Sequence, residues 1–244
     1  MKISSFTIGF LGLTTVMALS ISSAYAAEAA EAASKKAGAM PMLSYKAPLR
    51  GAPATRVGGA TRSGQATSMT LSVLAPDHTG YTVQDKPTIY WYVSKAITSP
   101  VELTVTAPEA IEPLLELTLT PPIKEGIHAL RLTDHGIALK PEVEYQWFVA
   151  VVTNPDERSK DILAGGSIQR VAASESVRTK LNEVGEIMWP AVYAESGLWY
   201  DAVDEISKLI EANPADGGLW AQRASLLTQA GLTQAAAYDS NTLK

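Results

Sequence analysis

The densest cluster of side chains that could do chemistry is a polar loop, Asn154–Asp161. Two carboxylates, Asp156 and Asp161, lie on either side of Arg158, a pattern that could bind a charged ligand or supply an acid for catalysis. The same residues also predict a turn, because Asn-Pro-Asp is turn chemistry and Arg158 can pair with a neighbouring carboxylate. The candidate binding loop therefore comprises Asn154, Asp156, Arg158 and Asp161, with Arg170 as a further member one strand later.

A second candidate surface consists of aromatic side chains near the C-terminus. Trp199, Tyr200 and Trp220 lie in segments with helical spacing, and large aromatic side chains are common anchors in protein interfaces. A stripe of aromatic and aliphatic residues is, however, more often the buried face of a helix. Both interpretations stay open on the sequence, and they differ in whether these rings are exposed.

The sequence contains no assembled catalytic, cofactor or metal site. It has no cysteine, which excludes disulfides, thiolate zinc sites and cysteine nucleophiles. The three histidines, His78, His128 and His135, lack the spacing of metal ligands. A glycosidase needs two carboxylates at a set separation, and the 25 acidic residues single out no such pair. We therefore expect a non-enzymatic protein without a cofactor.

The first residues predict export. Lys2 precedes a mostly apolar stretch, and Ala24-Tyr25-Ala26 has the small-x-small pattern of a signal-peptide cleavage site. The apolar core is short for a membrane span and is interrupted by Thr, Gly and Ser. We expect residues 1–26 to be a cleaved signal peptide and the mature chain to be periplasmic or extracellular, with no transmembrane anchor after cleavage near Ala26.

Residues 27–66 predict a flexible basic arm, because they are rich in Ala, Gly and Pro and lack hydrophobic periodicity. They carry six basic and two acidic residues, whereas residues 67–244 carry 13 basic and 23 acidic residues. The arm could lie on the acidic remainder of the chain or on an anionic envelope surface, or it could be a solvated tether. An exported chain with an acidic body is also a poor partner for nucleic acid.

Residues 67–172 predict an antiparallel β-sandwich. Hydrophobic residues alternate with period two in several short runs separated by turn residues, as in immunoglobulin-like domains. The run Leu139–Tyr145 resembles the tyrosine corner of such domains, in which a Tyr hydroxyl bonds to backbone a few residues upstream. Trp91 and Trp147 are predicted to point into the core.

Residues 173–244 predict a small helical domain. An apolar stripe with helical spacing runs over Trp199–Ile210, and Asn213-Pro214 ends that helix. Gly197 and Gly231 each follow a helical run and are 34 residues apart, which is the tetratricopeptide period. Since about one and a half repeats seldom stand alone, we expect these tetratricopeptide-like helices to pack on the sandwich.

Several short motifs, specific only in combination, resemble one bacterial family. They are Pro53–Arg62, Leu74-Ala75-Pro76, Pro87-Thr88 with Tyr90–Val93, Tyr145-Gln146-Trp147, Asn154–Ser159 with Asp161, Gly166–Val171, and Tyr193–Glu195 with Gly197–Ala202. Over about residues 53–235 the chain is similar to the family known as domain of unknown function 928, although Ala60 stands where that pattern usually has a third Gly. The resemblance implies an exported protein with this two-part layout, and it implies no known activity.

Two hypotheses of function follow. The first is a non-enzymatic interaction module of the bacterial cell envelope that binds a protein partner, because both expected folds are often used for binding. The second is a carbohydrate-binding or carbohydrate-cleaving envelope protein that uses exposed aromatic side chains and acidic loops. The identity of the partner and the oligomeric state are left open by the sequence.

Overall fold

The computed structural model describes three stretches of the chain, residues 42–48, 59–60 and 69–242. The predicted signal peptide with its cleavage site, and most of the predicted arm, lie outside the described residues. The chain divides into two units, residues 1–40 and 41–244, and the structure described below belongs to the second. None of the described helices is long and apolar enough to cross a membrane.

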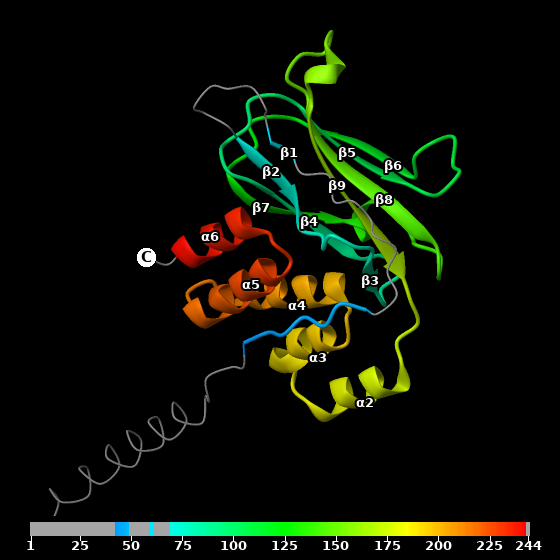
Figure 1. The fold of residues 1–244 in the computed structure, drawn as a ribbon, viewed down its shortest axis with the longest axis vertical. Coiled ribbons are helices and arrows are strands. Elements are labelled where there is room, and N and C mark those ends of the chain that lie inside the picture. The colour runs from blue at the N-terminus through cyan, green and yellow to red at the C-terminus, as the bar shows by residue number, and fades with distance from the viewer. Residues whose placement is uncertain (1–41, 49–58, 61–68, 243–244) are drawn as a thin grey trace, which may run out of the picture. The chain divides into compact units, whose positions relative to one another are not determined.

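The β-rich part of the chain forms two sheets, with strand orders β1-β2-β4-β7 and β3-β9-β8-β5-β6 (Figure 1). The strands are β1 (Gly59–Ala60), β2 (Thr70–Val73), β3 (Gly80–Thr82), β4 (Thr88–Val93), β5 (Val101–Thr106), β6 (Leu115–Leu119), β7 (Gly126–Arg131), β8 (Glu144–Val151) and β9 (Ile162–Arg170). Neighbouring strands are antiparallel except β3 and β9, which are parallel. The predicted antiparallel, β-rich architecture is therefore present.

The inward faces of the two sheets form the core of the β-rich part. A Cβ added at Gly166 in β9 would lie 2.6 Å from the Ala75 side chain just after β2, so the sheets are in direct contact there. Trp91 of β4 and Trp147 of β8 are 1% and 0% exposed, which confirms their predicted core positions. Along β5 every second side chain is buried, as its period-two pattern predicts.

The segment before β8 contains the hydrogen bond expected of a tyrosine corner. The Lys140 amide donates to the Tyr145 hydroxyl over 3.0 Å. Tyr145 is 2% exposed, so this bond satisfies a hydroxyl that burial has removed from water. The sequence prediction for this turn is confirmed, and the bond connects the beginning of β8 to the loop that precedes it.

The helical part follows β9 and contains helices at both predicted positions. The helices are α2 (Glu175–Glu183), α3 (Trp189–Glu195), α4 (Trp199–Ala212), α5 (Gly217–Gln229) and α6 (Thr233–Asn241), and the 3₁₀ turns are η1 (Leu132–His135), η2 (Arg158–Lys160) and η3 (Glu186–Met188). Gly197 and Gly231 have φ values of 76° and 72°. Both therefore end helices in the left-handed conformation that their position predicts.

The helices cover the outer face of the first sheet, and this explains why β4 does not alternate (Figure 1). Its inward residues face the second sheet, and its outward residues, Tyr90 and Tyr92, are buried as well. The Tyr90 hydroxyl donates to Asp204 of α4 over 2.9 Å, and the Tyr92 ring lies 5.7 Å from the ring of Tyr238 in α6. The helices thus pack on the β-rich part, as expected from their small number.

Two aromatic residues in the first turn of α4 make buried hydrogen bonds with the sheets. The Trp199 indole donates to the Leu74 carbonyl over 2.8 Å. The Tyr200 hydroxyl accepts from the Trp147 indole and donates to the Ser167 carbonyl, each over 2.9 Å. Tyr200 also needs the glycine in β3, because a Cβ at Gly80 would lie 2.6 Å from its ring. These contacts define what we call the seam between helices and sheets.

Asp201 is the charged member of the seam. Its carboxylate accepts from the Val83 amide over 3.0 Å and from the Thr82 hydroxyl over 3.2 Å. Burial raises the pKa of Asp201 to about 7, since the charged form loses water, and the two hydrogen bonds offset only part of this effect. The negative charge of Asp204 raises this pKa further.

A buried ion pair holds the last three helices together. The Arg223 guanidinium in α5 donates to both carboxylate oxygens of Asp239 in α6 over 2.8 Å, and to the Ser207 hydroxyl in α4 over 3.0 Å. Arg223 and Asp239 are 5% and 1% exposed. Loss of one partner would leave an uncompensated buried charge, so the pair makes the mutual packing of these helices specific.

Replacing Tyr200 by Phe removes one oxygen that satisfies two buried groups, Trp147 N–H and Ser167 C=O. Since each buried group without a partner costs about 1–3 kcal/mol, we expect Tyr200→Phe to lower the free energy of unfolding by about 3 kcal/mol in denaturant titrations. Tyr92→Phe is the matched control, because Tyr92 is buried between the first sheet and α6 and its hydroxyl makes no hydrogen bond with a described residue. Equal losses in the two variants would contradict this role of Tyr200.

The raised pKa of Asp201 predicts that stability depends on pH. In the unfolded chain this carboxyl has its ordinary pKa of 3.8, so between this value and about pH 7 the folded protein holds a proton that the unfolded chain has lost. The free energy of unfolding therefore falls as pH rises through this window, by at most about 1.4 kcal/mol per pH unit. The contribution is complete below pH 3.8 and is lost above about pH 7.

Asp201→Asn should remove this component of the pH dependence. Relative to the unsubstituted protein, we expect the variant to gain stability between about pH 5 and about pH 7.5, measured by denaturant unfolding at both values. Asp85→Asn changes an exposed carboxylate and serves as the control, with no expected difference from the unsubstituted protein. An unchanged pH dependence in Asp201→Asn would overturn the prediction.

Candidate functional site

The polar groups of the predicted binding loop, Asn154–Asp161, form hydrogen bonds within the loop and with β5. The Asn154 side chain accepts from the Asp156 amide over 3.0 Å, which forms the predicted turn. Arg158 bonds to Asp161 over 2.7 Å and to both carboxylate oxygens of Glu102 in β5. These hydrogen bonds raise the pKa of Arg158 above its ordinary value. The arginine thus fixes the loop on the sheet and has few donors left for a ligand.

Arg170 does not join this loop. It lies at the far end of β9, nine residues long, and about 26 Å of strand separates it from Ile162 at the end next to the loop. Its guanidinium donates to the Leu139 carbonyl over 3.2 Å, beside the tyrosine corner. The structure therefore separates Arg170 from the four loop residues with which the sequence analysis grouped it.

The aromatic residues of the predicted helical surface also take structural positions. Trp199 and Tyr200 are 0% and 2% exposed and belong to the seam, so neither ring is open to solvent while residues 42–48 are in place. Trp220 is half-buried, donates to the Pro214 carbonyl over 2.9 Å, and lies 5.2 Å below the Arg223 guanidinium. The interpretation of these side chains as exposed anchors is thus corrected for Trp199 and Tyr200, because covering the sheet requires their burial.

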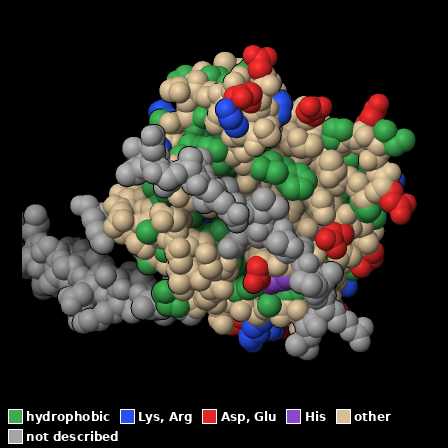
Figure 2. All heavy atoms as spheres, turned by 45° about the horizontal axis from the view of Figure 1, so that its top comes forward, with side chains coloured by type: hydrophobic (Ala, Val, Ile, Leu, Met, Phe, Trp, Pro, Cys, Tyr) green, Lys and Arg blue, Asp and Glu red, His purple; other side chains and the backbone are tan. Residues whose placement is uncertain are grey.

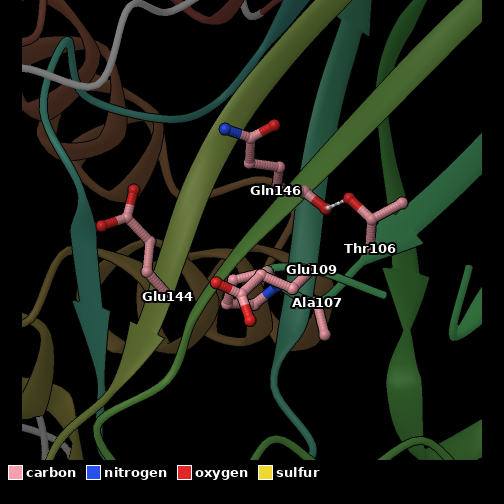
Figure 3. Close-up of a pocket in the computed structure, with 6 residues that line it drawn as sticks. Thr106, Ala107, Glu109, Glu144 and Gln146 are labelled. Carbon is pink, nitrogen blue, oxygen red and sulfur yellow. Dashed lines mark hydrogen bonds between the residues drawn. The ribbon is translucent and has the colours of Figure 1, made fainter. Parts of the chain in front are cut away.

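A pocket of ≈ 370 Å³ lies between the turn that follows β5 and the beginning of β8. Its lining residues are Thr106, Ala107, Pro108, Glu109, Glu144 and Gln146 (Figure 3). The two glutamates come from different segments, and their carboxylates do not converge on one point in Figure 3. Among the described residues, no group of three His, Cys, Asp or Glu side chains could hold a metal ion. Acidic side chains are scattered over the face drawn in Figure 2 instead of forming one patch.

Residues 42–48 lie against the helices in an extended conformation, and we call them the docked segment (Figure 1). Leu43 is 3% exposed and Tyr45 is half-buried, while Met42 before them and Ser44 between them are exposed. Side chains therefore alternate between the protein and the solvent, as in a β-strand. The docked segment is the part of the described chain whose position looks most like that of a bound ligand.

One side chain and one backbone carbonyl of the helices hold the backbone of the docked segment. The Gln229 Oε1 atom accepts from the Tyr45 amide over 2.9 Å, and its Nε2 atom donates to the Leu43 carbonyl over 2.7 Å. The Lys46 amide donates to the Ala194 carbonyl at the end of α3 over 3.1 Å. These three bonds satisfy backbone groups regardless of the side chains that the segment carries.

Tyr45 occupies a position between the helices and the β2–β3 turn. Its hydroxyl lies 2.9 Å from Nε2 of His78, and its ring meets the Trp199 ring edge-on with centroids 4.9 Å apart. Burial raises the pKa of Tyr45, and the charge of Asp77 adds to this effect. Nδ1 of His78 lies 3.2 Å from Asp77, so the imidazole is held from its other side. We define the docking surface as Ala194, Gly197, Trp199, Gln229 and His78.

The sequence predicts residues 27–66 as an arm that is either a solvated tether or lies on the acidic remainder of the chain or on an envelope surface, and it does not single out this site. Residues 42–48 lie packed and hydrogen-bonded on the remainder of the chain and Gly59–Ala60 forms β1, so the tether interpretation is wrong for these residues. Charge attraction between the arm and the acidic remainder does not explain the contact, since the described bonds involve backbone, amide and aromatic groups. The available signal was the alternation of Leu43 and Tyr45 within Ala- and Pro-rich sequence, which is too short to indicate a strand by itself.

Gly197→Ala should release the docked segment. A Cβ at Gly197 would lie 2.9 Å from the Lys46 carbonyl oxygen, in addition to the strain of φ 76°. Gly136→Ala is the matched control, because Gly136 has φ 68° and a Cβ there would meet nothing within 4 Å. We expect amide hydrogen exchange at Tyr45 and Lys46 to become at least about tenfold faster in Gly197→Ala only. The same change in both variants, or in neither, would contradict the contact.

The family comparison covers both parts of the described structure. No curated protein matches the sequence. The sequence profile of one family, described as Domain of Unknown Function (DUF928), matches residues 57–239, which is well over half of the chain. This range includes both sheets and α2 to α5, together with most of α6, and it begins after the docked segment. The chain therefore belongs to the DUF928 family, as the motifs in its sequence indicated.

Proposed function

We propose that the protein is an exported, non-enzymatic interaction module of the bacterial cell envelope, and that its helices bind a segment of a protein partner. The observation that carries this proposal is the docked segment itself. Its backbone is bound through Gln229 and Ala194. Of its side chains, Leu43 is buried, and Tyr45 contacts His78 and Trp199. Proteins that bind extended peptides hold the peptide backbone by hydrogen bonds and leave the peptide side chains that point to solvent unconstrained. The docking surface has both properties.

The finer fold class in this proposal is an immunoglobulin-like sandwich. In that fold the neighbours in one sheet are strands A, B and E, and those in the other are G, F, C and C′. Assigning β2, β4 and β7 to the first set and β9, β8, β5 and β6 to the second reproduces these orders. The Tyr145 bond then falls at the start of strand F, where a tyrosine corner belongs.

We propose a tetratricopeptide-like relationship for the pairs α3–α4 and α5–α6. The two pairs repeat after 34 residues, and corresponding residues share their environment. Gly197 and Gly231 are both left-handed, and Leu198 and Leu232 are 5% and 4% exposed just before the second helix of each pair. Helical repeats of this kind often present a surface to extended peptides, which is compatible with the position of the docked segment.

Export and the envelope location rest on the N-terminal sequence pattern, Lys2 followed by an apolar stretch and Ala24-Tyr25-Ala26. The rival proposal of a carbohydrate-binding or carbohydrate-cleaving protein has less support. Saccharide sites commonly offer an exposed aromatic ring, and the large hydrophobic side chains exposed among the described residues are all aliphatic: Met42, Ile111, Leu114, Leu163 and Ile187. The acidic pocket of Figure 3 has no aromatic lining residue.

The test is in-cell crosslinking followed by affinity purification of the tagged full chain. We expect one stoichiometric protein partner to be captured by the unsubstituted protein and by Gln234→Ala, which changes an exposed glutamine of α6. Gln229→Ala should capture at least about tenfold less, since it removes two of the three backbone hydrogen bonds of the docking surface. Equal capture by the two variants, or saccharide binding that is lost on Glu144→Gln, would overturn the proposal.

A further inference from the structure

The contacts of the docked segment depend on little besides an extended backbone. The Gln229 side-chain amide pairs with the Leu43 carbonyl and with the Tyr45 amide two positions later. It therefore requires the spacing of these two groups in an extended backbone and no particular side chain. Its Nε2 atom also donates to the Ser225 carbonyl over 3.2 Å, which holds the side chain in position on α5. A segment from another chain could form the same bonds, because none of them involves the residues that connect the segment to β1.

Two side chains add selectivity to these backbone contacts. Leu43 is almost completely removed from solvent, which favours an aliphatic residue at this position. Two residues later, Tyr45 contributes a ring to Trp199 and a hydroxyl to His78. The positions before and between them, Met42 and Ser44, face solvent and are unconstrained. The surface is thus complementary to an aliphatic residue, any residue and a tyrosine in succession.

The docking surface lies inside the range that the family profile matches, and the docked segment lies outside it. Four of the five residues of the docking surface lie on or beside helices α3 to α5, and all five fall within the range matched by the family profile. The docked segment precedes that range. The surface therefore lies within the part of the chain that the family profile describes, and the docked segment lies before that part.

We propose that residues 42–48 are a displaceable intramolecular ligand, and that the docking surface takes an extended segment of a partner protein with an aliphatic residue two positions before a tyrosine. This inference rests on the proposed function and deepens it, because it names the site and the chemistry of the partner. The docked segment acts as an internal competitor: while it occupies the surface, a partner must displace it.

The strength of this competition follows from the short connection. Ten residues, 49–58, separate the segment from β1, so an attached ligand is present at an effective concentration of the order of 1 mM. A segment with one fully buried side chain and three backbone bonds binds weakly by itself. Attachment nevertheless keeps it in place, and a partner with the same motif gains access when the attached copy is weakened or when additional contacts assist the partner.

The experiment uses a fluorescent peptide with the sequence of residues 42–48 and purified full-length protein, with binding followed by anisotropy. In Leu43→Ala/Tyr45→Ala the attached copy is weakened, and we expect the peptide to bind at least about tenfold more tightly than to the unsubstituted protein. Met42→Ala/Ser44→Ala changes the two outward positions of the same segment and is the matched control. It should bind the peptide no better than the unsubstituted protein does.

Two further arms keep the inference falsifiable. Adding Gln229→Ala to Leu43→Ala/Tyr45→Ala should weaken peptide binding at least about tenfold, whereas adding Gln234→Ala should not. Circular dichroism and thermal melting check that each variant is folded. Absence of peptide binding by folded Leu43→Ala/Tyr45→Ala, or equal affinity in that variant and the unsubstituted protein, would overturn the inference.

The alternative occupant of the docking surface is residues 42–48 of a second copy of the chain. If the unsubstituted protein is a dimer by light scattering and Leu43→Ala/Tyr45→Ala is a monomer, the segment serves a neighbouring copy and the partner proposal is wrong. Failure of the proposed function would instead appear only in the cellular capture experiment. The peptide experiment uses purified protein, so the two failures are distinguishable.

Discussion

The structure depends on satisfying polar groups in a seam that excludes water. Three consecutive residues at the start of α4, Trp199, Tyr200 and Asp201, each carry a polar atom into the contact with the sheets. Each atom meets a backbone group from a different strand or strand end, at Leu74, Ser167 and Val83. Because a buried polar group without a partner is costly, a shift of α4 along the sheet would leave several of them unpaired. The seam therefore fixes where the helices lie, and hydrophobic burial alone would not.

The docking surface is a consequence of the seam. His78 comes from the turn between β2 and β3, whereas Ala194 and Gln229 come from α3 and α5. Trp199 belongs to both places, since its indole N–H enters the seam and its ring contacts Tyr45. The Arg223–Asp239 ion pair in turn sets the packing of α5 on α4 and α6, and Gln229 lies on α5. Side chains that bind the segment are thus positioned by structural contacts that the segment does not touch.

The loop with the most conspicuous chemistry has a structural role, and the site with ligand-like contacts has unremarkable composition. Arg158 beside two carboxylates attracts notice in a sequence, yet it binds one of them, Asp161, together with Glu102 of β5. Gln229 carries no charge, and its importance comes from facing a backbone that needs both a donor and an acceptor. Neutral side-chain amides are suited to this task because each can donate a hydrogen bond to a backbone carbonyl and accept one from a backbone N–H. Burying them does not carry the desolvation cost of an ion.

The sequence by itself determined most of the strands, the helices around Trp199 and Trp220, much of the core and the family. Period-two runs and helical stripes report which faces are apolar, and the turn residues, Gly197 and Gly231 among them, report backbone conformation. These signals are local, so Trp91, Trp147 and the Tyr145 turn could be predicted correctly.

Only the tertiary structure decided which side chains meet. Trp199 and Leu74 are 125 residues apart, and Gln229 and Leu43 are 186 residues apart. It was therefore the packing of the helices on the first sheet that buried Trp199 and Tyr200 and brought residues 42–48 onto α3 and α5. The length of β9 separated Arg170 from the loop. The physical reason is that the spacing of apolar residues in the sequence indicates that a face of a strand or helix is covered. It does not indicate which distant segment covers that face.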